Sequence, residues 1–226
     1  MIRVLSIDLD SIWDGEDSIY RDPDKKLNPK MLSLVQSLST LPRKVLRVGL
    51  DHHMMCQELD KFREPYEIDH IDAHHDLYAE GHYSWLNPLF IRAKRVTIGN
   101  FLFQVLREGS LAKMTWLIPD TFDQAQCKLK VIQNIGEFYA QKVEVKNALI
   151  HPFKEEYDLV FISLSVEWIP ENAVKIIEEI LINFELPQEK ILVHLYAMHK
   201  RWGCKDDEKL TRADRFYFEE LYKVVP

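Results

Sequence analysis

The chain has 226 residues, 46% of them hydrophobic and 29% charged, which is enough for the core of one large α/β domain. A net charge of −7 argues against a nucleic-acid partner. The sequence has no long apolar run, so we expect no membrane span and no signal peptide. The three cysteines lack C-x-x-C spacing, which predicts reduced thiols in a cytoplasmic protein.

The first third of the chain alternates between apolar, β-branched segments typical of strands and segments with helical periodicity. In chain order, the predicted elements are a strand at residues 3–10, a loop at 16–29, a helix at 31–41, a strand at 44–50, a helix at 54–62 and a strand at 66–76. The loop is polar and contains two prolines, which disfavour regular structure there.

The remainder of the chain continues the alternation. In chain order, the predicted elements are a short strand at residues 95–99, a helix at 101–107, a strand at 114–118, a helix within 122–141, a short strand or hairpin within 142–152, a strand at 157–163, a helix at 170–184, a strand or other buried segment at 190–196 and a helix at 210–224. Proline in its first turn favours the helix that begins at Pro170.

Strands that alternate with helices predict a fold class. We expect a single domain over residues 1–226, a three-layer α/β/α fold around a mostly parallel sheet. In such folds ligands bind outside the carboxyl ends of the strands. Residues that follow the predicted strands are therefore the candidates for a functional site.

The stretch I-D-H-I-D-A-H-H-D, which ends at Asp76, contains three carboxylates and three imidazoles. If the whole stretch is a strand, Asp72, His74 and Asp76 project to one face. His70 and His75 are expected to face away from these three side chains, which are the candidate metal ligands. Carboxylate oxygens and imidazole nitrogens in this arrangement suit Mn²⁺, Fe²⁺ or Zn²⁺, and the alternative interpretation is a polar edge strand.

Four predicted strands end in such residues, and six of the nine histidines lie between positions 52 and 82. The strand ends carry, in order, Asp8 with Asp10, His52 with His53, Asp72 with His74 and Asp76, and Glu167. This convergence favours two adjacent divalent ions that activate a bridging water for hydrolysis.

Two alternatives concern single strand ends. The Asp8 and Asp10 pair also fits a D-x-D nucleophile motif of phosphatases. His53 either begins a helix and faces solvent or replaces His52 as the ligand.

These segments resemble the arginase and agmatinase superfamily, the ureohydrolases. D-A-H-H-D at residues 72–76 resembles its D-A-H-x-D signature, and G-L-D-H at 49–52 resembles its G-G-D-H, with Leu50 departing from the pattern. S-I-D-L-D at 6–10 resembles its S-x-D-x-D strand, and S-L-S-V-E-W-I-P at 163–170 is similar to the strand end whose glutamate receives the guanidinium. Arginases have S-x-D-x-D after D-A-H-x-D. The reverse order found here resembles a divergent branch of peptide arginases, which convert arginine side chains of ribosomally made peptides to ornithine.

The resemblance implies an arginase-like fold with two Mn²⁺ ions, with Fe²⁺ or another divalent ion as alternatives. The implied ligands are His52 and Asp76 on one ion, His74 and Asp10 on the other, and Asp72 and Asp8 between them.

It also implies three catalytic residues, Glu167, His82 and Asp76. Glu167 would bind the guanidinium, and His82 would pass a proton to the leaving amine. A different interpretation of Glu167 is an acidic residue that favours the start of the helix at Pro170.

The expected function is therefore hydrolysis of arginine side chains in a precursor peptide to ornithine and urea, in the cytoplasm. Three alternatives stay open: a ureohydrolase for free arginine, agmatine or another small guanidine, a one-zinc deacetylase of lysine or polyamines, and a non-catalytic metal-binding regulatory protein. The sequence determines neither the peptide nor the oligomeric state.

Overall fold

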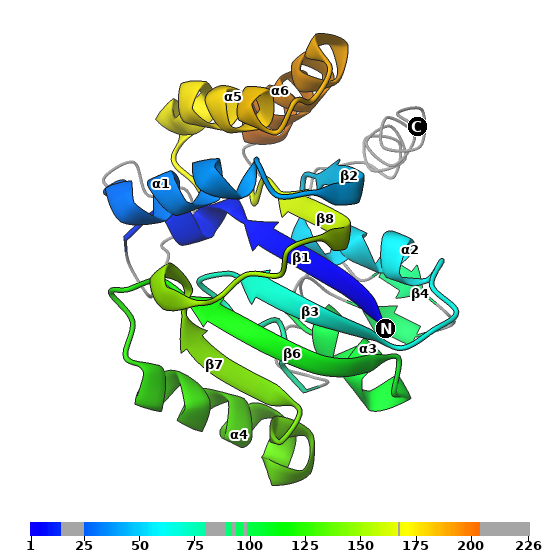
Figure 1. Cartoon of the computed structure of the whole chain (residues 1–226). Helices are drawn as coiled ribbons and strands as arrows, with labels where there is room; N and C mark the ends of the chain where they lie inside the picture. Colours follow the sequence, from blue (N-terminus) through cyan, green and yellow to red (C-terminus); the bar gives the residue numbers. More distant parts are fainter. Residues whose placement is uncertain (15–24, 80–88, 92–93, 97–98, 167, 204–226) are drawn as a thin grey trace.

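The computed structural model describes residues 1–14, 25–79, 89–91, 94–96, 99–166 and 168–203. Its centre is a six-stranded parallel sheet with the order β2-β8-β1-β3-β6-β7 (Figure 1). The strands are β1 Ile2–Asp8, β2 Arg43–Gly49, β3 Tyr66–Ile71, β6 Leu111–Ile118, β7 Val143–Asn147 and β8 Tyr157–Ser163. A separate antiparallel pair consists of β4 Leu89–Ile91 and β5 Lys94–Val96.

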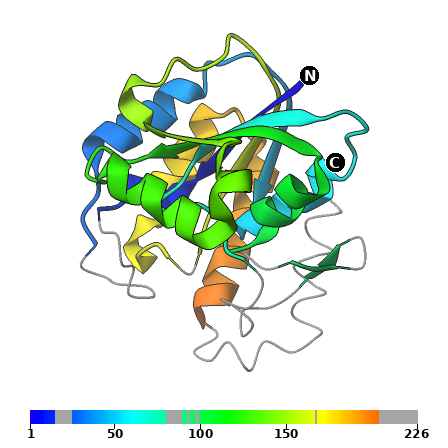
Figure 2. The ribbon, with the colours of Figure 1, turned by 90° about the horizontal axis from the view of Figure 1, so that it is seen from below.

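Helices cover both faces of the sheet, so the predicted three-layer α/β/α fold is confirmed (Figures 1 and 2). Helices α3 and α4 pack against β6 and β7 on one face, while α1, α5 and α6 form the opposite layer. The α-helices are α1 Pro29–Leu38, α2 Met55–Leu59, α3 Phe101–Glu108, α4 Gln124–Ala140, α5 Val174–Asn183 and α6 Gln188–Gly203. None of the helices in the described part of the chain is long and apolar enough to cross a membrane.

Buried strands and capped helices explain this arrangement. β1 and β8 are central, and five of seven residues in β1 and six of seven in β8 are buried, as in strands covered by helices on both faces. Asn28 caps α1 by accepting hydrogen bonds from two backbone N–H groups, and Pro29 occupies its first position. Gly109 ends α3 with a φ of 83°, a conformation that glycine adopts without steric cost.

Most predicted elements are present, with shifted ends. The helix predicted at residues 54–62 is shorter, because η2 His52–Met54 precedes α2. The helix predicted from Pro170 begins with the turn η4 Glu171–Ala173 and continues as α5. The strand alternative for residues 190–196 is wrong, since they belong to α6. Most of the loop at 16–29 and all of the helix at 210–224 lie outside the described residues.

The strand predicted at residues 66–76 is also wrong in its second half, because β3 ends at Ile71. Asp72 Oδ1 accepts a hydrogen bond from the backbone N–H of His74 at 2.7 Å, a local turn that takes the chain out of the sheet. Asp76 then adopts a left-handed conformation with a φ of 52°. The D-x-H-x-D segment is therefore a loop at the carboxyl end of β3.

Candidate metal centre

The carboxyl ends of four neighbouring strands meet at one edge of the sheet. Ser163 of β8 is in register with both Asp8 of β1 and Gly49 of β2, and Ile7 of β1 is in register with Ile71 of β3. The segments that follow these strands therefore surround a common pocket. The described residues that line it are Asp8, Asp10, Asp51, His52, His74, Asp76, Tyr78, Gly99, Ser165 and Trp168.

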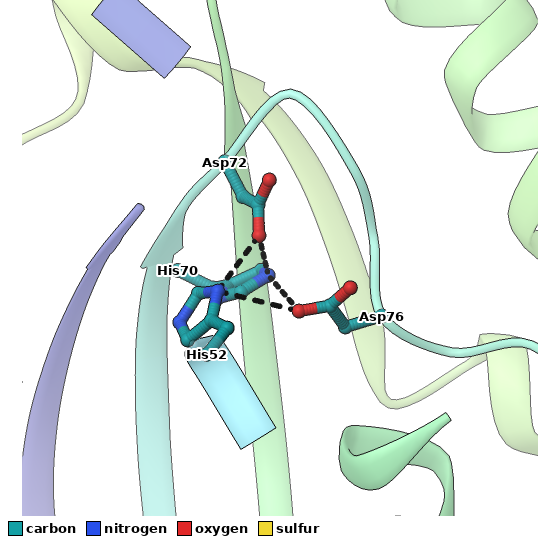
Figure 3. Close-up of side chains that lie close together, drawn as sticks. All are labelled: His52, His70, Asp72 and Asp76. Atoms are coloured by element: carbon teal, nitrogen blue, oxygen red, sulfur yellow. Dashed lines mark hydrogen bonds and ion pairs between the residues drawn. The ribbon is translucent and has the colours of Figure 1, made fainter. Parts of the chain in front are cut away.

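Four buried side chains form what we call the inner group, His52, His70, Asp72 and Asp76 (Figure 3). One ligand atom from each lies within 4.8 Å of the others. His52 Nδ1 is 3.0 Å from Asp72 Oδ2 and 3.3 Å from Asp76 Oδ2. His70 Nε2 is 3.2 Å from Asp72 Oδ2 and 3.9 Å from Asp76 Oδ2. Two nitrogens and two oxygens thus face one small volume.

Three side chains form the outer group, Asp10, Asp72 and His74. His74 Nδ1 lies 3.0 Å from Asp10 Oδ2 and 3.7 Å from Asp72 Oδ1. Asp72 belongs to both groups, with Oδ2 directed to the inner group and Oδ1 to the outer group. The His74 side chain is 28% exposed, so the outer group is the more accessible of the two.

Asp8 lies beside the inner group. Its Oδ2 is 3.0 Å from His52 Nδ1, and its Oδ1 accepts a hydrogen bond from the backbone N–H of Asp10 at 3.2 Å. Asp8 thus caps the turn η1 Leu9–Ile12, which directs Asp10 toward His74. Asp10 was predicted to end the strand, but it lies in this turn. All six side chains predicted from the sequence as ligands are close together in the structure.

His52 is held in place by residues behind it. The Ser6 hydroxyl contacts its Nε2, so Nδ1 is the nitrogen that faces the carboxylates. The ring is parallel to Phe161, with centroids 6.1 Å apart. A Cβ at Gly49 would lie 2.7 Å from Phe161 Cζ, so a larger residue where β2 turns toward His52 would displace that ring. Such supporting contacts fix the orientation of a ligand.

Burial and mutual repulsion perturb the acidic groups. Burial, together with the charges of Asp10 and Asp72, raises the pKa of Asp8 to about 7. Burial and the charge of Asp72 raise the pKa of Asp76 well above its usual value. For Asp72, burial is outweighed by its close contacts with the surrounding histidines, which hold its pKa well below the usual value. Burial lowers the pKa of His70, which favours the neutral imidazole that binds metals.

Several of these atoms lack the partners that buried polar groups normally have. Asp10 Oδ1, Asp76 Oδ2 and both ring nitrogens of His70 are buried and make no hydrogen bond with any described residue. A divalent cation would satisfy these atoms and offset the repulsion between the carboxylates. Oxygen and imidazole donors suit a divalent transition metal. The cluster could therefore hold a divalent metal ion.

The histidines correct and refine the sequence interpretation. The prediction that His70 faces away from the metal is wrong, because it precedes Asp72 by two residues and shares its face of the sheet. The sequence carried a signal for this position of His70, because residues two apart in a strand share a face and His70 is two residues before Asp72. His75 does point elsewhere, with its ring beside Trp116 and Tyr78.

His52 and His53 have different positions. His52, and not His53, faces the carboxylates. His53 is buried, so the alternative of a solvent-facing side chain is wrong.

Glu167 and His82 lie outside the described residues. Their neighbourhood is described in part, since Ser165 and Trp168 both line the pocket. The Trp168 ring lies 5.6 Å from that of His74. Tyr78 also lines the pocket, and neither aromatic residue was predicted as a site residue. The sequence signal for both was only their position shortly after a predicted strand.

Comparisons with protein-family models, with curated proteins and with solved structures gave no match. The functional interpretation therefore depends on the residues and geometry of this site. What these establish is an α/β fold whose sheet edge carries a buried histidine and aspartate cluster suited to a divalent metal ion.

Proposed function

We propose that this protein is a peptide arginase, which uses two Mn²⁺ ions to hydrolyse the guanidinium group of arginine side chains in a precursor peptide. The observation that carries the proposal is the pair of ligand groups joined by Asp72, at the carboxyl edge of a parallel sheet. The resemblance of residues 72–76 to the D-A-H-x-D signature of ureohydrolases supports the same reaction class.

Each ligand has a defined place in this proposal. His52 and Asp76 would hold the inner ion, and His74 and Asp10 the outer ion, with Asp72 serving both. Asp8 lies next to His52 and would complete the set. When bound, two adjacent divalent ions make a water molecule nucleophilic at neutral pH and stabilise developing negative charge. The Ser6 hydroxyl and the Phe161 ring keep His52 in its orientation.

The reaction balances without a protein nucleophile. Water attacks the guanidinium carbon, the bond from that carbon to the side-chain nitrogen breaks, and urea leaves. The freed nitrogen takes up a proton and becomes the ammonium of ornithine. We assign this proton transfer to His82 and the binding of the guanidinium to Glu167, which directly precedes the pocket residue Trp168 in the chain.

The lining of the pocket favours a cationic substrate. Its described residues include four aspartates and no lysine or arginine. Trp168 and Tyr78 offer aromatic faces, which attract guanidinium groups. The same residues offer no cation to pair with the α-carboxylate of free arginine, and the ammonium of the adjacent Lys25 donates a hydrogen bond to the Trp168 backbone oxygen. This favours an arginine within a peptide, and agmatine, which also lacks that carboxylate, is the second candidate.

The test is urea release from Mn²⁺-loaded protein supplied in parallel with arginine-containing peptides, free arginine and agmatine. We expect urea from the peptides, which should each lose one CH₂N₂ unit by mass spectrometry. Asp72→Asn should abolish the reaction because both ligand groups depend on this carboxylate.

The matched control is Asp123→Asn, which changes the same group at the cap of α4, where asparagine also caps well. Urea from free arginine or agmatine, but not from peptides, would mean that the substrate is a small guanidine and not a peptide. No urea from any substrate, with metal bound, would exclude guanidinium hydrolysis.

A further inference from the structure

We propose that His70 is an additional metal ligand, and that with His52 it makes the inner group a two-nitrogen position that fills before the outer one. The sequence resemblance implies one histidine for each ion, so this ligand distinguishes the present chain. The inference depends on the metal in the proposed function but not on the substrate. It can therefore be tested without any measurement of urea.

The position of His70 is the first argument. It lies on β3, is fully buried, and its Nε2 faces Asp72 Oδ2 at 3.2 Å and Asp76 Oδ2 at 3.9 Å. Its ring lies beside that of His52, with centroids 4.7 Å apart. The close-up shows the two rings and the two carboxylates directed toward one point (Figure 3).

The hydrogen bonding of His70 is the second argument. Neither of its ring nitrogens makes a hydrogen bond with a described residue. A histidine that only fills a core normally has a partner for its nitrogens, because burying a polar group without one destabilises the fold. By contrast, Asp69, the preceding residue, accepts a hydrogen bond from the Tyr157 hydroxyl at 2.6 Å. Both buried ring nitrogens of His151 also lack a hydrogen bond with any described residue, but His151 Nε2 lies near the single carboxylate of Asp69. His70 Nε2 instead lies near two carboxylates and beside a second imidazole, which is the surrounding expected of a metal ligand.

The two groups differ in donors and in burial. The inner group has two imidazoles and two carboxylates, whose side chains are at most 8% exposed. The outer group has one imidazole, His74, whose side chain is 28% exposed. Imidazole favours Fe²⁺, Co²⁺ and Zn²⁺ over Mn²⁺, whereas carboxylates suit Mn²⁺. We therefore assign the tighter and more nitrogen-rich binding to the inner group.

The first test is a titration of metal-free protein with Co²⁺, followed by calorimetry and by visible absorption. We expect two binding steps for the unchanged protein. His70→Asn should weaken the first step by at least about tenfold, the lower range for loss of a group that only supports a ligand, and change its spectrum. The second step should change less.

The matched control is His75→Asn, a buried histidine in the same segment whose ring contacts Trp116 and Tyr78 instead of the carboxylates. It should retain both steps. Circular dichroism of the metal-free variants would show that each is folded. Two unchanged steps in His70→Asn, or a single step with equal affinities in the unchanged protein, would overturn the proposal.

A second measurement needs no variant. Proton NMR of the unchanged protein with one equivalent of Co²⁺ should show two exchangeable, strongly shifted imidazole N–H signals, from His52 and His70. Both rings are buried, which slows exchange of these protons with water. A single shifted N–H signal would mean that His70 is not a ligand.

Discussion

Asp69 and His70 are adjacent on β3 and point to opposite faces of the sheet, where their surroundings differ. On one face, Asp69 Oδ2 accepts a hydrogen bond from the Tyr157 hydroxyl, and its Oδ1 lies 3.4 Å from His151 Nε2. On the other face, His70 and Asp76 carry buried atoms without hydrogen-bond partners among the described residues. Both regions are buried, polar and built from the same residue types.

The pKa values express this difference. Burial opposes ionisation of Asp69, but hydrogen bonds with His151 and Tyr157 outweigh it and place its pKa below the usual value. Burial and the charge of Asp72 instead raise the pKa of Asp76. A buried carboxylate with partners stabilises the fold, whereas one crowded by other carboxylates needs a cation. Burial of charged residues alone therefore does not identify a site, whereas several carboxylates and histidines crowded around one small volume do indicate one.

The largest expected effect is on metal content. Asp72→Asn should remove both ions, because its two oxygens face the two ligand groups separately. Asp10→Asn, which alters the outer group alone, should remove one. Metal analysis after gel filtration in Mn²⁺ measures both. Retention of two ions by Asp72→Asn would refute the proposal that the Asp72 carboxylate serves both ligand groups.

The next effect is on folding and concerns the opposite face of β3. Asp69→Asn should lower the free energy of unfolding by about 1.5–3 kcal/mol, the range for hydrogen bonds to a charged group, because it loses charge-assisted contacts. Metal affinity should not change. Denaturant unfolding of metal-free protein measures this effect.

Asp76→Asn is the matched variant on the site face. It relieves repulsion, so the metal-free protein should be no less stable than the unchanged one. Equal destabilisation by Asp69→Asn and Asp76→Asn would remove the distinction between the two faces.

A smaller effect on metal affinity is expected from Ser6, which contacts the ligand His52 on the side away from the carboxylates. Ser6→Ala removes the hydroxyl that contacts His52 Nε2 and should weaken metal binding about tenfold, as for other groups that orient a ligand. Calorimetric titration with Mn²⁺ measures it. Ser163→Ala offers a control in a neighbouring strand, since Ser163 Oγ lies 3.1 Å from Ser165 Oγ and contacts no predicted ligand through any described hydrogen bond. Equal losses in both variants would point to a general disturbance of the sheet edge.

The last expected effect is a dependence of stability on pH. The pKa of Asp8 rises from 3.8 to about 7 on folding, so between these values the folded chain binds more protons than the unfolded one. Its contribution to the stability of metal-free protein should therefore decrease as the pH rises through this window. Added Mn²⁺ should remove this decrease, because the bound ion favours the ionised carboxylate. Thermal unfolding with and without the metal tests it, and equal slopes would contradict the prediction.

The sequence by itself determined the alternation of strands and helices and the residues at the strand ends. Local periodicity predicted β1, β2, β6 and β8 to within a few residues, since these are regular segments rich in apolar and β-branched residues. It also identified six acidic and histidine side chains that the structure brings together. Parallel strands explain that success, because their carboxyl ends share one edge.

Only the tertiary structure decided the details on which the chemistry depends. β8, late in the chain, lies between β1 and β2, a long-range pairing that places Trp168 in the pocket. The D-x-H-x-D pattern has the period of a strand, yet a hydrogen bond between Asp72 and the His74 backbone makes it a loop. Whether His70 faces the carboxylates or the side of Asp69 and Tyr157 likewise depends on which segments pack on each face of β3. Sequence periodicity is local, whereas these contacts join residues far apart in the chain.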